Sequence, residues 1–512
     1  LPEQMRKTIL LCGVLGMEFL HRTYTEVCSR LAIPPASDPV FQGLVEKGML
    51  IRADSDKGKM RGYRFRHPLI QKTACGSNLS HNLKLIHRAA AESIQELFRN
   101  DQGRISARLA AHWEGAGETA KASEWGLAAQ KYASENYQHP TVLYWGEKLL
   151  QWLPEELEDR LKVLERNSRA YLFTGRRDEQ LAALREMERI AADRNLPFWT
   201  AKAQIDLGFH LRSTGDISGA KTLLEKALEL CRDNGLEDLE SSTLGNLGVL
   251  ASDTGSVEEA REYFTSAGKI HARLGNRRAE ASTLGNLGII LRNARDYRGA
   301  GEKFQGALEI FQELGDIRSE AITLGNLGNI HHDLGELDQA LDLYEKTLEM
   351  FTRIGDRRSM GVFLGNLGIL QADMGNREKA EDYYQRALAI SRETGNLRSR
   401  GWTLSNMASM KMKDESPEEA AELYKEALDL FRQVKDRRME AIILAALGYS
   451  TFLAGNAEES LEALKGSVAL ASELKLPRGD FEGTLIPHHS RLNEEHTQLQ
   501  VPELPEHWRG ST

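Results

Sequence analysis

An asparagine recurs every forty residues through the middle of the chain, in nearly the same local sequence each time. The hexapeptide TLGNLG stands at 243–248, 283–288 and 323–328, with the variants FLGNLG at 363–368 and TLSNMA at 403–408. A side-chain amide both donates and accepts hydrogen bonds, so it can hold the C=O and N–H of a peptide backbone together. The row consists of Asn246, Asn286, Asn326, Asn366 and Asn406. This row predicts a surface that binds the backbone of an extended peptide.

Helical spacing places further polar residues on the same face as each asparagine. Positions four, three and four apart share one face of a helix, and in the third copy they are Ile322, Asn326, Asn329 and Asp333. A stripe packed in a core would be wholly apolar, so we expect this half-polar stripe to face a ligand. The polar stripe residues outside the row are Asp253, Asn293, Asn329, Asp333 and Asp373. The competing interpretation is that the asparagines tie adjacent helices together and contact no ligand.

Two glycines flank each asparagine in the four best copies. Gly245 and Gly248 form the first such pair, and each glycine inside a helix costs about 1 kcal/mol relative to alanine. We expect close helix–helix packing to require the second glycine. We expect the first glycine, beside the asparagine, to leave room for the backbone of a ligand.

A row of arginines lies just inside the same predicted helices. Cations at a helix N-terminus oppose the helix dipole, so we expect these arginines to pair with acidic residues of their own or a neighbouring unit. The alternative is a basic edge that receives an acidic partner. The row consists of Arg278, Arg318, Arg358, Arg398 and Arg438.

No catalytic or metal-binding motif accompanies these rows. The sequence contains no GxxxxGK[ST] phosphate loop, no nucleophile elbow and no HExxH. We expect His331 and His332 to be a solvated or partly packed pair on a repeat helix. His488, His489 and His496, near the end of the chain, lack acidic or cysteine partners at metal-ligand spacing. We therefore expect no enzymatic activity, no cofactor and no metal in this chain.

Composition suits a cytoplasmic protein and gives no sign of nucleic-acid or membrane binding. The formal net charge is −9, which gives no attraction to nucleic acid or to an anionic membrane. No run approaches the roughly 18 apolar residues of a membrane span. Four scattered cysteines suit a reducing compartment and argue against disulfides or a zinc site.

The elements that carry these rows are predicted as pairs of helices. Each forty-residue unit contains a break near its middle and a second break such as LGN or LGD at its end, where Gly275 and Gly315 suit a left-handed helix end. Asn276 and Asp316 follow as candidate N-caps of the next helix. A single helix pair cannot bury its apolar face, so the units must stack into a solenoid.

The unit resembles the tetratricopeptide repeat (TPR). NLG, a small residue twelve positions after the glycine, an aromatic four later and an alanine three later match its pattern, as at Ala260, Phe264 and Ala267. The forty-residue length resembles the repeats of kinesin light chain and of cell-polarity scaffolds. The resemblance implies an all-α fold, a right-handed TPR superhelix whose first helices line the concave surface. We expect about seven to eight units over residues 159–476.

Residues 1–78 have a different pattern, with three predicted helices followed by a hairpin around the Lys/Gly-rich tip SDKGKMRG. This order predicts a winged-helix domain. The run YRFRHPLIQKTACGSNLSHNLKLIHRAAAESI resembles the segment that follows the nucleotide-binding core of STAND-type signalling ATPases. The resemblance implies an upstream NTPase domain in cis, outside this sequence. We expect a helical linker with degenerate repeats over 79–158 and a polar, disordered tail over 477–512.

The function predicted from the sequence is a regulatory interaction module. It binds a peptide or protein segment in the concave groove and, by resemblance, acts as the sensor of a STAND-type ATPase. The alternative is a transcription regulator that uses the winged helix on DNA, with the repeats as signal sensor. The third predicted helix, DPVFQGLVEKGM, carries one lysine against an aspartate and a glutamate, and a helix that enters a DNA groove needs several basic residues.

Overall fold

A computed structural model describes residues 1–53, 61–99, 101–474, 476, 478–495 and 500–508. The chain divides into two compact units, Leu1–Ala203 and Gln204–Thr512. Helices dominate both units, as predicted. None of the helices among the described residues is long and apolar enough to span a lipid bilayer.

Three helices and a small antiparallel sheet open the first unit. The elements are α1 (Glu3–Leu15), β1 (Glu18–Leu20), α2 (His21–Arg30), α3 (Asp38–Glu46), β2 (Leu50–Arg52) and β3 (Gly62–Phe65). The sheet order is β1-β3-β2. The predicted helices and the β2–β3 hairpin are confirmed, whereas β1 was not expected, and residues 54–60 of the hairpin tip lie outside the described residues. The rings of Phe41 and Tyr63 stack with centroids 4.7 Å apart and join the third helix to the sheet.

Further helices fill the rest of the first unit. They are α4 (Pro68–Gly76), α5 (Ser80–Leu97), α6 (Gln102–Ala116), α7 (Thr119–Glu135), α8 (His139–Trp152), α9 (Glu158–Phe173) and α10 (Arg177–Asp193), with α11 (Pro197–Thr214) running across the unit boundary. Buried tryptophans and small residues of α6–α8 form one core, centred on Trp113 and Trp145.

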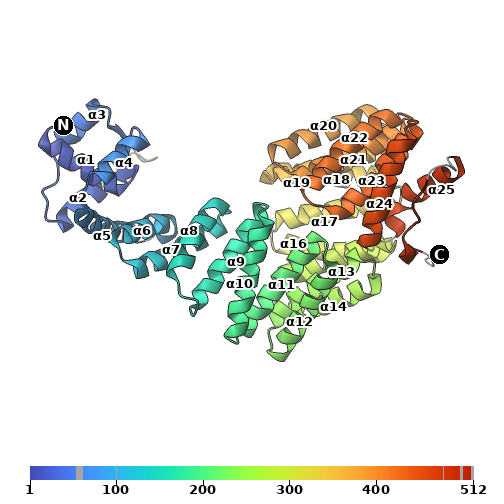
Figure 1. The fold of residues 1–512 in the computed structure, drawn as a ribbon, viewed down its shortest axis with the longest axis horizontal. Helices are drawn as coiled ribbons and strands as arrows, with labels where there is room; N and C mark the ends of the chain where they lie inside the picture. The colour runs from blue at the N-terminus through green and yellow to red at the C-terminus, as the bar shows by residue number, and fades with distance from the viewer. Residues whose placement is uncertain (54–60, 100, 475, 477, 496–499, 509–512) are drawn as a thin grey trace. The chain divides into compact units, whose positions relative to one another are not determined.

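The second unit is a stack of helix pairs (Figure 1). The pairs after α11 and α12 (Ile217–Asp233) are α13/α14 (Glu237–Asp253, Val257–Leu274), α15/α16 (Arg277–Asn293, Tyr297–Glu313), α17/α18 (Ile317–Asp333, Leu337–Ile354), α19/α20 (Arg357–Asp373, Arg377–Glu393), α21/α22 (Leu397–Lys413, Pro417–Gln433) and α23/α24 (Arg437–Leu453, Ala457–Glu473). Each helix contacts the next along the chain, both within a pair and between pairs. Figure 1 shows successive helices from α12 to α24 lying side by side.

The breaks between helices follow the predicted chemistry. Gly275 and Gly315 adopt φ values of 69° and 63°, in the left-handed region where a side chain is disfavoured. The Asp316 carboxylate accepts a hydrogen bond of 3.2 Å from the Ser319 backbone N–H and so caps α17. Asn276, in contrast, makes no side-chain cap bond to its helix.

The end of the chain differs from the expected disordered tail over 477–512. The described residues there form η1 (Arg478–Phe481), α25 (Leu485–Glu495) and η2 (Glu506–Trp508). Phe481, Leu485, Leu492 and Trp508 are buried in one cluster with residues of α23 and α24. The Trp508 indole N–H donates to the Leu476 carbonyl at 2.8 Å. These four apolar residues cover the end of the stack that would otherwise face water.

Candidate functional site

The five asparagines occupy the same place on five first helices. They lie on α13, α15, α17, α19 and α21, and each side chain is half-buried. The residue four positions before each asparagine is exposed on the same face. We call this surface the Asn face; its exposed flanking residues are Ser242, Ser282, Ile322, Val362 and Trp402.

The asparagine amides are not used to join neighbouring repeats. Asn246 donates to the Ser242 carbonyl of its own helix at 2.9 Å. Asn326 accepts a 3.4 Å bond from Asn329, also within its own helix. In the described part of the chain, no hydrogen bond involves the side-chain amide of Asn286, Asn366 or Asn406. The row therefore presents donors and acceptors to whatever lies against the Asn face.

The two glycines of each repeat have different surroundings. A Cβ on the second glycine would lie 2.9 Å from the Phe264 ring at Gly248 and 2.5 Å from the Tyr384 ring at Gly368. A Cβ on Gly245 or Gly285 would meet nothing within 4 Å. The second glycine is thus required by the aromatic residue of its own helix pair, as predicted. The first leaves open space beside the asparagine in these two repeats.

The first glycine is not open in every repeat. At Gly325 a Cβ would lie only 2.1 Å from the Phe363 ring, so packing of the next first helix requires this glycine. At Gly365 the nearest atom is the Thr403 hydroxyl oxygen, at 3.9 Å. Gly365 is itself buried, so the expectation of room for a ligand backbone fits Gly245 and Gly285 but not Gly325 or Gly365.

The outer positions of the predicted stripe have different roles. Asn329 accepts a hydrogen bond of 2.5 Å from the Tyr344 hydroxyl of the second helix in its pair, and Ser409 makes the same contact with Tyr424 at 2.9 Å. Burial raises the pKa of the Tyr344 phenol. Asn293, by comparison, is exposed. Asn329 is thus already engaged in packing its own repeat.

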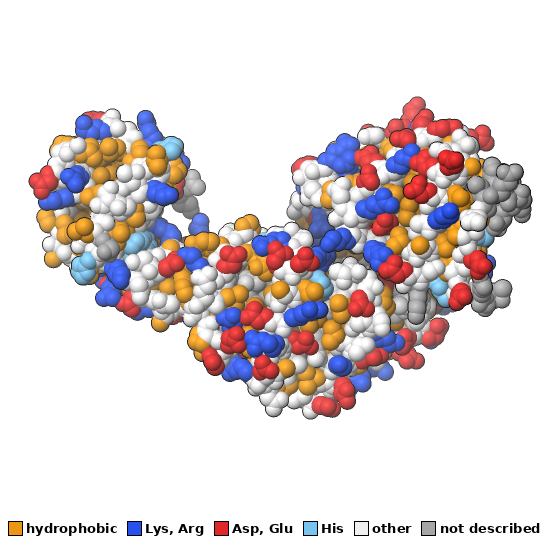
Figure 2. Space-filling view, in the orientation of Figure 1, with side chains coloured by type: hydrophobic (Ala, Val, Ile, Leu, Met, Phe, Trp, Pro, Cys, Tyr) orange, Lys and Arg blue, Asp and Glu red, His pale blue; other side chains and the backbone are white. Residues whose placement is uncertain are grey.

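The predicted stripe carboxylates pair with cations of adjacent repeats. Asp253 pairs with Arg212 at 2.8 Å, and Asp333 with Arg292 at 2.5 Å. These partners, one period away, were not predicted, although their spacing of 41 residues is visible in the sequence. Figure 2 shows the resulting intermixture of acidic and basic side chains over the second unit.

Asp373 has two such partners. Its carboxylate accepts from Lys413 at 2.8 Å and lies 3.0 Å from a ring nitrogen of His332. Burial alone would raise the pKa of Asp373, but the hydrogen bonds from Lys413 and His332 outweigh burial and lower the pKa. This carboxylate is therefore ionised and neutralised near neutral pH.

Four of the five row arginines form ion pairs with an aspartate that lies further along the chain. In three of these pairs the aspartate is the N-cap of a later first helix, and in the fourth it is Asp480 of η1. Arg278 pairs with Asp316. The other pairs are Arg318 with Asp356 (2.7 Å), Arg398 with Asp436 (2.7 Å) and Arg438 with Asp480 (3.0 Å). The expected pairing with neighbouring units is confirmed for these four residues, and Arg358 is the exception.

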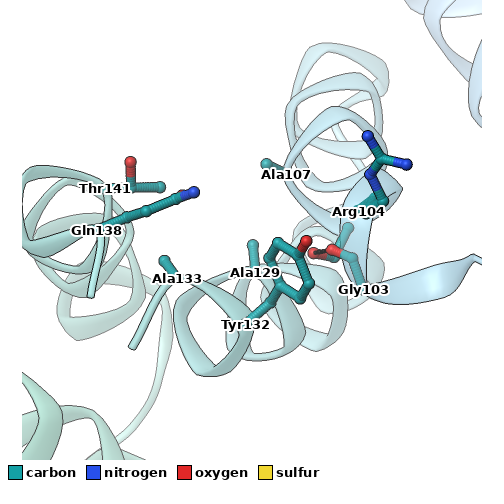
Figure 3. Close-up of a pocket in the computed structure, with 9 residues that line it drawn as sticks. Gly103, Arg104, Ala107, Ala129, Tyr132, Ala133, Gln138 and Thr141 are labelled. Atoms are coloured by element: carbon teal, nitrogen blue, oxygen red, sulfur yellow. Dashed lines mark hydrogen bonds between the residues drawn. The ribbon is translucent and has the colours of Figure 1, made fainter. Parts of the chain in front are cut away.

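Two shallow pockets lie away from the Asn face. One of about 330 Å³ lies among α6, α7 and α8, where Arg104, Tyr132, Gln138 and Thr141 surround a floor of alanines (Figure 3). The other, of about 530 Å³, is lined by His331, Asp338, Gln339, Asp342 and Leu343. Among the described residues, no group of three His, Cys, Asp or Glu side chains could hold a metal ion.

The repeat geometry agrees with one family model. The model of the tetratricopeptide repeat matches residues 199–273, 279–353, 319–393 and 399–473, which together make up just over half of the chain. The chain belongs to the tetratricopeptide repeat family. A search among curated proteins finds no match.

Several solved structures are similar to this chain at low sequence identity. BtubC (BKLC) from P. vanneervenii is 23% identical, with 43% of this chain and 92% of that chain covered and a TM-score of 0.38. A Rap protein complexed with competence and sporulation factor is 12% identical, covering 69% and 98%, with a TM-score of 0.46. A STAND protein with a tetratricopeptide repeat sensor from Pyrococcus horikoshii is 15% identical, covering 97% and 64%, with a TM-score of 0.34.

Proposed function

We propose that this TPR chain is a regulatory module that binds an extended peptide segment of a partner protein along the Asn face. The partner's backbone C=O and N–H groups would meet one asparagine amide per repeat. First helices that contact each other, as α15 and α17 do, pack roughly 8–10 Å apart, and an extended peptide advances about 3.3 Å per residue. One amide would therefore engage about every third residue of the peptide, whatever its sequence.

The observation that carries this proposal is the set of amides without a structural partner. Asn286, Asn366 and Asn406 stand on three first helices, and the described structure gives their amides no hydrogen bond. A half-buried asparagine has little effect on the stability of a repeat. Its recurrence at one position in five repeats therefore indicates a function at that position. The open space at Gly245 and Gly285 supports the same conclusion, since it admits a backbone close to the row.

The contacts between first helices support a groove. Besides touching the second helix between them, α15 contacts α17 and α19 contacts α21. These first helices contact each other although a second helix lies between them in the sequence. Such contacts are expected on the inner side of a curved stack, where the helices are closest together. A peptide on the Asn face would then lie in the concavity, with more surface buried than on a flat face.

We further propose that residues 1–78 form a winged-helix domain that connects the repeats to an upstream ATPase of the STAND type. The order helix–strand–helix–helix–strand–strand and the sheet order β1-β3-β2 support the winged-helix assignment. The ATPase is inferred from the resemblance of residues 63–94, which run from β3 of this domain through α4 into α5. Peptide binding to the repeats would then regulate nucleotide hydrolysis by that domain.

Affinity capture from a lysate tests the role of the Asn row. The variant carries Asn286, Asn326 and Asn366 replaced by Ala. The matched control replaces Gln305, Glu345 and Gln385 by Ala; these three residues are exposed, lie one period apart on second helices and belong to the same three repeats. We expect the parent and the control to retain a common partner that the Asn variant loses.

Equal melting temperatures of the three proteins must accompany this result, so that folding does not explain it. Retention of the same partners by the Asn variant would contradict the proposal. Loss of partners by the second-helix control alone would move the binding surface to the opposite face of the stack.

A further inference from the structure

The ion pairs at the starts of the first helices form a repeating ladder. In three steps the arginine just inside one first helix reaches the aspartate that caps a later first helix: Arg278 reaches Asp316, Arg318 reaches Asp356 and Arg398 reaches Asp436. Arg318 reaches Asp356 at 2.7 Å, and the same Asp356 carboxylate accepts from the Ser359 backbone N–H at 3.0 Å. Burial alone would raise the pKa of Asp356, but the bonds from Arg318 and Ser359 outweigh it and lower the pKa. Asp316, Asp356 and Asp436 therefore each cap their own helix and neutralise the preceding arginine of the row.

One step of the ladder is open. The N-cap of α21 is Asn396, which caps its helix by accepting from the Ser399 backbone N–H at 3.2 Å. In the described part of the chain, no ion pair or hydrogen bond involves the guanidinium of Arg358, the arginine that precedes it. Asparagine and aspartate are equally good N-caps. The exchange thus keeps the cap and leaves one arginine without a counter-charge.

The step between α13 and α15, which has no arginine, still contains a side-chain hydrogen bond. There the roles are reversed, since Asp238 occupies the arginine position and accepts from the Asn276 amide at 3.0 Å. The break at Arg358 is therefore specific to the step between α19 and α21.

Apolar side chains gather around the open step. Val362 lies one turn beyond Arg358 on the same face of α19 and is 45% exposed. The equivalent residues of the adjacent first helices are Ile322, 37% exposed, and Trp402, 46% exposed. In the two earlier repeats this position is serine, at Ser242 and Ser282. The apolar part of the Asn face thus coincides with its one unneutralised arginine among the five of the row.

We propose that Arg358 and the apolar surface of Ile322, Val362 and Trp402 select a peptide that carries a carboxylate within two residues of an aliphatic side chain. This inference rests on the proposed binding of a peptide to the Asn face. A guanidinium binds a carboxylate through two parallel hydrogen bonds. Arg358 and Val362 are one helical turn, about 5.4 Å, apart, which one or two residues of extended peptide span.

The charge of the site argues for this peptide over a basic or neutral one. A free arginine repels a cationic side chain and gains nothing from a neutral one. The Asn366 amide lies one turn beyond Val362 and would hold the peptide backbone, so charge and backbone contacts fall on one helix. The carboxylates of Asp333 and Asp373, at the far ends of α17 and α19, pair with Arg292 and Lys413 and do not oppose an acidic ligand.

A single exchange closes the open step without removing any residue of the site. In Asn396→Asp the new carboxylate is expected to cap α21 equally well and to pair with Arg358, as Asp356 does with Arg318. The matched control is Asp356→Asn, which opens a second step beside Ile322 and leaves Arg358 as it is. Both variants should melt close to the parent.

The probes are three pools of fluorescent synthetic twelve-residue peptides, random except for a central Val-X-Glu, Val-X-Gln or Val-X-Lys. We expect the parent to bind the Glu pool about threefold to fivefold more tightly than the Gln pool, as an exposed charge pair allows. Asn396→Asp should reduce this preference to less than about twofold. Asp356→Asn should retain or increase it, and added salt should weaken it in the parent.

Each result has one meaning. Binding of all three pools with equal affinity, or an unchanged preference in Asn396→Asp, would overturn the selection by Arg358 while leaving peptide binding to the Asn face intact. Failure of the folded parent to bind any pool would overturn both this inference and the proposed function. A preference for the Lys pool would overturn the assigned charge of the ligand.

Discussion

The middle repeats and the terminal repeat share one architecture but differ at the asparagine position. From α13 to α22 this position is a half-buried asparagine, whereas in α23 it is Ala446, which is buried. The C-terminal segment packs on α23, where Arg438 pairs with Asp480 and the rings of Tyr449 and His488 lie 6.1 Å apart. A tie between helices would be needed in both places. On the helix that the C-terminal segment covers, the asparagine is replaced by Ala446, which favours a ligand as the reason for the row.

The second glycine reveals the same difference. In the middle repeats it faces an aromatic residue of its own helix pair, such as Phe264. In the terminal repeat that residue is Leu464, and a Cβ on Gly448 would instead lie 2.9 Å from the His488 ring. Ser460, at a position occupied by alanine in the middle repeats, bonds His488 at 2.7 Å. The terminal repeat is adapted to the C-terminal segment as the others are adapted to the next repeat.

The largest effect is expected from removing the segment's main apolar contact. Phe481 is fully buried against α23 and α24, so Phe481→Ala should lower the free energy of unfolding of this region by about 3–5 kcal/mol. Because repeats contact only their neighbours, hydrogen exchange should accelerate in α23 and α24 and remain unchanged in α13–α16. Trp402→Ala, on the Asn face, is the control and should cost little. Equal loss of protection in every repeat would contradict this picture.

The pH dependence of stability should depend on His488. Burial, and next the charge of His489, lower the pKa of His488 to about 4, whereas an unfolded histidine titrates near pH 6.5. Below about pH 6.5 the unfolded chain binds a proton that the folded chain excludes. The stability of the terminal repeat is therefore complete above this pH and is lost as the pH falls toward about 4, by on the order of 2 kcal/mol.

His488→Gln separates this effect from other titrations. Glutamine keeps a polar contact to Ser460 but does not titrate, so urea unfolding of the variant should depend less steeply on pH between about 7 and 4 than that of the parent. Parallel pH profiles would assign the dependence to other groups, among them the buried His112 of the first unit, whose pKa burial lowers to about 3.

Replacing each of the two glycines of α15 by alanine, in separate variants, compares a position that faces an aromatic ring with one that faces open space. A Cβ on Gly288 would lie 2.8 Å from the Phe304 ring, so Gly288→Ala should cost about 1–2 kcal/mol. Gly285→Ala meets nothing within 4 Å and should gain about 0.5–1 kcal/mol from helix propensity. Thermal unfolding of both variants measures these values. A loss of stability in Gly285→Ala would show that the first glycine is also needed for packing.

The repeats were predictable from the sequence because one pattern is written many times. Gly275 and Asp316 recur at fixed spacing, and helix breaks need those residue types, so the helix ends follow directly. The C-terminal segment offers no such pattern, because Phe481, Leu485, Leu492 and Trp508 are spread without a period among polar residues and prolines. β1 has three residues and pairs with a strand more than forty positions away, so no local signal predicts it.

The site was predictable in its positions but not in its partners. Helical spacing gave the face of the asparagines, since it depends only on the period of one helix. The pairing of Asp253 with Arg212, or of Asn329 with Tyr344, depends on which of several nearby groups comes within hydrogen-bond distance. The missing ion pair at Arg358 could be recognised only by comparison with the four row arginines that do pair with an aspartate.

The smallest expected effect is the most informative about the Asn row. If the amides join no helices, replacing Asn286, Asn326 and Asn366 by Ala should change the free energy of unfolding by less than about 0.5 kcal/mol each, with a gain allowed by the higher helix propensity of alanine.

A side chain that does form a hydrogen bond between two helices provides the control. The Ser467 hydroxyl of α24 donates to the buried Ala441 carbonyl of α23 at 2.8 Å, and alanine occupies this position in most other repeats, so Ser467→Ala should fit and cost about 1 kcal/mol. Urea unfolding compares the two. Equal costs per residue would make the asparagines ties between helices, and the recurrence of GNLG would then be explained by packing alone.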